Sequence, residues 1–86
     1  MVEQIGNYRF RYCNDVDRPG KVRIYIEQQP SYNGKPTDSH STHRLSSGSG
    51  APPHICIKSE CQPSTLAQAQ AKAREWIGYT ERYRRS

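Results

Sequence analysis

Basic side chains alternate with apolar ones in two segments near the N-terminus, residues 8–13 and 21–27. Alternation with a period of two is typical of β-strands and places every second side chain on the same face of a sheet. Cationic groups that share a face can bind the phosphates of a nucleic acid, and a tyrosine among them can stack on a base. With a third segment, 54–58, the predicted outer face carries Arg9, Arg11, Lys21, Arg23, Tyr25, His54, Cys56 and Lys58, with Glu27 as its main acid.

A second basic cluster lies near the end of the chain and consists of Arg82, Arg84 and Arg85. Lys and Arg number 13 against 8 Asp and Glu, which gives a net charge of +5. An excess of positive charge favours an anionic partner, and nucleic acid is the first hypothesis. The alternative is that Arg and Lys only solvate the open face of a one-layer sheet, where they are ordinary residues.

Two histidines and two cysteines supply the side-chain types that bind zinc: His40, His43, Cys56 and Cys61. In zinc fingers the cysteine pair comes first and lies in a tight turn, whereas here the histidines come first, so we expect no zinc and no other cofactor. Asp38 beside the histidines has the chemistry for general acid–base catalysis. A polar loop in a thin domain offers no rigid pocket, however, and we expect no enzymatic activity.

Four aromatic residues, one in the loop 30–53 and three in the C-terminal segment, are candidates for a protein interface. Tyr, Trp and Arg are enriched at the energetic centres of such interfaces, and the candidates are Tyr32, Trp76, Tyr79 and Tyr83. The same side chains could belong to the core or its rim. A protein-interaction module, for example a homodimeric accessory protein, is therefore the alternative to nucleic-acid binding.

Three strands must position the basic residues. Residues 8–13 and 21–27 flank the turn signal Pro19-Gly20 and predict a β-hairpin with a long loop. Residues 54–58 predict a third short strand. Residues 30–53 are rich in Ser, Gly and Pro, and we expect a polar, partly flexible loop with a possible short fourth strand near His43–Leu45.

A helix is predicted at the C-terminus. Thr65 followed by Gln68 is a capping-box pattern, and apolar residues recur from there to about Tyr83 at spacings typical of a helix. The predicted fold is α+β, with a three-stranded antiparallel sheet packed on this helix. The predicted core is Tyr8, Phe10, Tyr12, Val22, Ile24, Ile26, Ile55, Ile57, Leu66, Ala69, Ala73, Trp76 and Ile77. This order of elements resembles small β-sheet DNA-binding domains at the N-termini of some phage-type integrases, a resemblance of fold alone.

The length and composition set the remaining bounds. With 86 residues, of which 12 are Leu, Ile, Val or Phe, the chain is one small domain over 1–86 with a thin core. No apolar run approaches the roughly 18 residues of a membrane helix, so we expect no membrane association. Residues 1–6 lack the features of a secretory signal, which favours a cytoplasmic location. Three cysteines favour free thiols over a disulfide framework.

Overall fold

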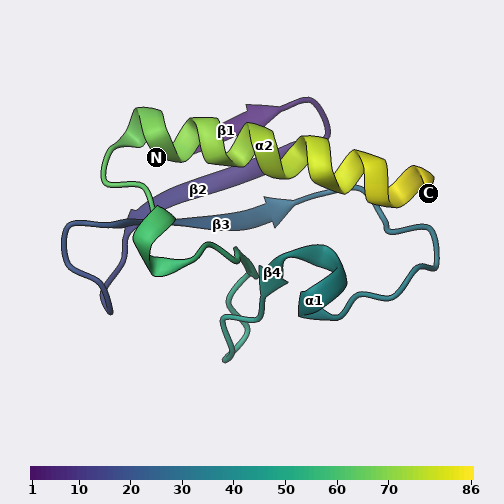
Figure 1. Ribbon diagram of the computed structural model, residues 1–86, viewed down its shortest axis with the longest axis horizontal. Helices are drawn as coiled ribbons and strands as arrows, with labels where there is room; N and C mark the ends of the chain where they lie inside the picture. The colour runs from purple at the N-terminus through teal and green to yellow at the C-terminus, as the bar shows by residue number, and fades with distance from the viewer.

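The computed structural model describes residues 1–86 and confirms the α+β class: an antiparallel sheet of five strands packs one face on a long C-terminal helix (Figure 1). The strands are β1 (Val2–Ile5), β2 (Tyr8–Asn14), β3 (Val22–Gln28), β4 (Arg44–Leu45) and β5 (His54–Ile55). They lie in the order β1-β2-β3-β5-β4. The helices are α1 (Ser39–Thr42), the 3-10 turn η1 (Ser59–Cys61) and α2 (Leu66–Arg85).

The predicted hairpin is confirmed as β2 and β3, and a strand that was not predicted, β1, pairs with the free side of β2. The turn Gly6-Asn7 joins β1 to β2, and the φ of 56° at Gly6 suits the first central position of a type II′ hairpin turn. Val2 and Gln4 are exposed whereas Ile5 is half-buried. With only four residues and two apolar positions, the segment Val2–Ile5 is too short for its alternation to predict a strand.

The predicted fourth strand is confirmed as β4, but the third strand is shorter than predicted. Pairing between β3 and β5 is limited to Tyr25 and His54, and the strand ends at Ile55. The next amide, of Cys56, donates to the carbonyl of His43, directly before β4, and so extends the pairing with β4 by one bond. Residues 57 and 58 lie outside the sheet, so this strand is shorter than the alternation over 54–58 predicts.

The helix α2 begins at the predicted cap and runs two residues beyond Tyr83, to Arg85. The amide of Gln68 donates to the Thr65 hydroxyl (3.2 Å), and the Gln68 side chain accepts from the amide of Ser64 (2.9 Å). Two otherwise free amides are thereby satisfied at the helix start. Arginines in the last turn interact favourably with the negative end of the helix dipole.

The core lies between the sheet and α2, as predicted for most of its residues. Tyr8, Phe10, Tyr12, Ile24, Ile26, Ile55, Ala69, Ala73 and Trp76 are buried in one cluster, with Val22, Ile57 and Ile77 partly buried against it. The prediction for Leu66 is wrong, because this first residue of α2 is 41% exposed. The fully buried Thr42 and Thr80 were not predicted.

Candidate nucleic-acid interface

One face of the sheet is free of helices, and we call it the outer face. The other face carries the core side chains that pack on α2, which runs in nearly the same direction as β2 and β3 in Figure 1. The short helix α1 also lies on the α2 side, because Trp76 and Tyr79 of α2 donate hydrogen bonds to carbonyls of Thr42 and Ser41. The outer face is therefore not covered by α1 or α2.

The strand register forms a row across the whole outer face. Arg11 pairs with Tyr25 and Tyr25 with His54, and the row extends to Val2 on β1 and to Leu45 on β4. Residues that pair across strands share a face of the sheet. Arg9 and Arg23 flank the row, opposite Gln28 and Cys13. The four sequence-predicted residues Arg9, Arg11, Arg23 and Tyr25 thus share one surface with His54.

Arg11 is held by three neighbours. Its Nε lies 3.1 Å from a carboxylate oxygen of Glu27, its Nη1 lies 3.2 Å from Cys13 Sγ, and its Cζ lies 4.5 Å above the centre of the Tyr25 ring. Arg9 and Phe10 pair with Gln28 and Ile26, so Glu27 is an extra residue in β3, as in a β-bulge. The Arg11 guanidinium consequently has a fixed orientation on the face.

Arg9 and Arg23 differ in their charge partners. Arg9 is exposed, and its Nε donates to the side-chain oxygen of Gln4 (2.9 Å) rather than to a carboxylate. Arg23 lies 3.3 Å from Asp15 and 3.4 Å from Asp17. Part of the positive charge that the sequence assigns to this face is therefore compensated within the fold.

The buried carboxylate of Asp15 is the centre of a polar network at the hairpin loop. Burial raises its pKa, but hydrogen bonds from Gln62 and from the Asp17 amide, with the charge of Arg23, outweigh this and hold the pKa below its usual value. The loop between β2 and β3 is thereby fixed to the segment before α2. The network orients Arg23 and stabilises the loop between β2 and β3.

His54 lies in the middle of the row. Its ring centre is 6.2 Å from that of Tyr25, with the planes at 74°, and its Nδ1 is 2.8 Å from the Ser47 hydroxyl. Burial lowers the pKa of His54, Arg23 lowers it further, and Asp15 opposes the shift. The imidazole is therefore neutral at pH 7 and presents an aromatic surface beside Tyr25.

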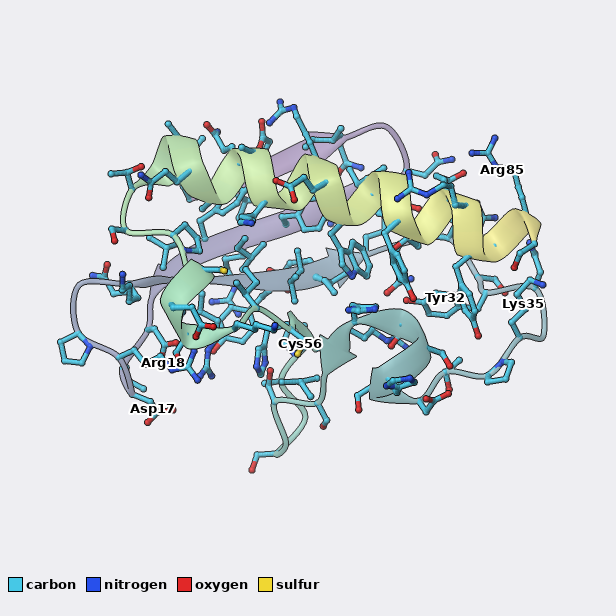
Figure 2. All side chains as sticks on the ribbon, viewed as in Figure 1. Asp17, Arg18, Tyr32, Lys35, Cys56 and Arg85 are labelled. Carbon is cyan, nitrogen blue, oxygen red and sulfur yellow. The ribbon has the colours of Figure 1, made fainter.

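The remaining predicted basic residues lie away from this row. Lys21 donates to the Ser64 hydroxyl near the start of α2 (3.1 Å). The prediction that Lys58 and Cys56 lie on the outer face is wrong, because both line a groove beside α2. Figure 2 places Arg85 at the opposite end of the molecule from Arg18 in the hairpin loop.

The C-terminal arginines belong to the helix layer and form no common surface with the outer face. Arg84 contacts Glu81 at 2.9 Å and donates to the carbonyl of Ser31 at 2.7 Å. Arg85 donates to the carbonyl of Glu81, and the Arg82 guanidinium lies beside Gly78 on the same helix. The two basic clusters of the sequence are therefore separate in space.

The four aromatic interface candidates pack within the fold. Tyr32 and Trp76 are buried, at 6% and 4% exposure. The Trp76 indole donates to the Thr42 carbonyl (3.1 Å), the Tyr83 hydroxyl to the Pro36 carbonyl (2.7 Å), and Tyr79 to that of Ser41. These side chains fix the segment before β4 onto α2, where Tyr79 and Tyr83 stay half-buried.

The zinc candidates are only partly brought together. His43, Cys56 and Cys61 line a groove of about 280 Å³ whose apolar wall includes Trp76, and His40 is not among the lining residues. The His43 ring packs on Tyr79 with 4.4 Å between the ring centres. No group of three His, Cys, Asp or Glu side chains is arranged to hold a metal ion, and all three cysteines are free thiols.

Comparison with known proteins identifies no relative: no family model, curated protein or solved structure matches the chain. No helix combines the length and the apolar character needed to cross a lipid bilayer.

Proposed function

We propose that this chain is a small non-enzymatic module that binds nucleic acid through the outer face of its sheet. The observation that supports this proposal is the row of Arg11, Tyr25 and His54 across three neighbouring strands, on a face that no helix covers. Arg9 and Arg23 flank the row. Guanidinium groups contact phosphates and aromatic rings contact bases, so the row has both types of group that nucleic-acid binding requires.

The charge balance of the hairpin sets the expected strength of binding. Residues 8–28 carry five basic and three acidic side chains, a net charge of +2. Of the arginines on the face, Arg9 has no carboxylate partner, whereas Arg11 and Arg23 are paired with acids. Because phosphate contacts supply most of non-specific binding, we expect micromolar rather than nanomolar affinity.

A salt titration tests the proposal. Fluorescence anisotropy of labelled single- and double-stranded DNA and RNA is measured between about 50 and 200 mM salt. The variant in which Arg9 and Arg11 become alanine should bind more weakly. If both arginines contact phosphates, its salt slope should be smaller by roughly 1.4 on single strands and roughly 1.8 on duplexes, since each lost phosphate contact removes about 0.7 or about 0.9.

The matched control removes the same charge from the helix layer, by Arg82→Ala with Arg85→Ala. We expect this control to bind almost as tightly as the unmodified protein, because both residues lie on α2, away from the outer face. Absence of binding at low salt would refute the proposal, and so would equal losses in the two double variants. A protein partner would then be the function to test.

A further inference from the structure

We infer that the nucleic acid bound by the outer face is single-stranded and crosses the strands along the row, with a base stacked on the guanidinium of Arg11. This inference rests on the proposed function and names the class of nucleic acid for the same surface.

The width of the sheet argues against a duplex. Neighbouring strands lie about 4.8 Å apart, so the five strands span roughly 19 Å, whereas the major groove of B-DNA is about 12 Å wide. The hairpin cannot enter the groove as a free ribbon, because β1 flanks β2 and β5 flanks β3. A single strand lying on the surface has no such restriction.

The charges on the face lead to the same conclusion. A duplex presents one negative charge about every 1.7 Å along its axis and needs several cations for binding. Here the face has one arginine, Arg9, without a carboxylate neighbour. The carboxylate of Asp17 is 75% exposed at the hairpin end, where it repels phosphates. Binding must therefore gain much of its free energy from contacts to bases, whose faces are accessible in single strands.

The side chains of the row provide a site for a base. The guanidinium of Arg11 lies over the Tyr25 ring, which supports it from one side, and Glu27 fixes its orientation at 3.1 Å. An arginine plane is a surface on which an unpaired base can stack. His54 stands next to Tyr25 with its ring nearly perpendicular, and forms a wall beside this site.

The test compares a labelled oligothymidylate with a mixed-sequence duplex of the same length, at about 50 mM salt. We expect the single strand to bind at least about tenfold more tightly. Arg11→Lys keeps the charge but removes the planar group, and should weaken single-strand binding roughly five- to tenfold with an unchanged salt slope.

Two variants at Tyr25 serve as a matched pair. Tyr25→Phe keeps the ring below Arg11 and should bind the single strand within about twofold of the unmodified protein, whereas Tyr25→Val should resemble Arg11→Lys. Thermal melting of each variant verifies that the fold is intact. Equal or tighter binding of the duplex would overturn the inference and leave the proposed function standing, as would an unaffected Arg11→Lys variant. Failure to bind either oligonucleotide would overturn both.

Discussion

Replacing Gln62 by alanine should destabilise the fold by about 3 kcal/mol, because this side chain fixes the loop between β2 and β3 to the segment before α2 through three hydrogen bonds. Gln62 is 8% exposed. Its amide nitrogen donates to Asp15 (2.8 Å) and to the carbonyl of Val22 (3.1 Å), and its oxygen accepts from Arg18 (2.8 Å). The substitution removes the Gln62 amide that donates to one oxygen of the buried Asp15 carboxylate.

The magnitude follows from these contacts. A hydrogen bond to a charged group contributes about 1.5–3 kcal/mol, and one to a carbonyl about 0.5–1.5 kcal/mol. The hydrogen bond from the exposed Arg18 contributes little to stability. In the variant, the Asp15 carboxylate still accepts from the Asp17 amide and still pairs with the Arg23 guanidinium. A loss of about 3 kcal/mol is a large part of the 5–15 kcal/mol typical of domains and lowers Tm by more than about 10 °C.

Urea unfolding measures this loss. The chain has one tryptophan, Trp76, and its 4% exposure makes its fluorescence a reporter of unfolding. The urea concentration at the midpoint of unfolding should fall, while the dependence of the unfolding free energy on urea concentration stays constant. Gln28→Ala, at an exposed position of β3, is the control and should change stability by less than about 0.5 kcal/mol. A loss below about 1 kcal/mol for Gln62→Ala would show that the Asp15 carboxylate does not depend on the Gln62 amide as its donor.

Three further predictions concern other contacts. Trp76→Phe should cost about 1–2 kcal/mol in urea unfolding followed by circular dichroism, because the carbonyl of the fully buried Thr42 loses its donor. Tyr79→Phe removes the hydroxyl that contacts the Ser41 carbonyl, and should speed amide hydrogen exchange in α1 while β2 and β3 exchange as before. The pKa of His54 is lowered in the folded state, mainly by burial, so the unfolded chain binds its proton more readily. Stability should therefore fall as the pH drops below about 6.5, and thermal melting should show a weaker pH dependence for His54→Gln.

The fold class could be predicted because its main signals are local. Alternation over two segments and a capped amphipathic segment are enough to define β2, β3 and α2. β1 has only Ile5 packed against the core, and a single apolar position shows no period. Leu66 fits the helical spacing of apolar residues but is the first residue of α2. This spacing does not indicate at which residue the helix begins to contact the sheet.

The candidate site could be predicted in part. Arg9, Arg11, Arg23 and Tyr25 share a face because the side-chain period of a strand is two, whatever the tertiary structure. The early end of β5 was not predictable, because the alternation continues to Lys58 although the strand ends at Ile55. The aromatic residues of α2 were equally ambiguous. Their polar tips donate to carbonyls that only the tertiary structure brings near.

A nuclear magnetic resonance titration of the isotope-labelled protein with an oligothymidylate, followed through the backbone amides, tests most directly whether the outer face binds nucleic acid. We expect shift changes concentrated at Arg9, Arg11, Tyr25 and His54, on three neighbouring strands of one face. Amides along α2 should change little, because that helix lies on the opposite side of the sheet. Changes concentrated around Arg82 and Arg85, or no changes at low salt, would contradict the assignment of the outer face as the binding surface.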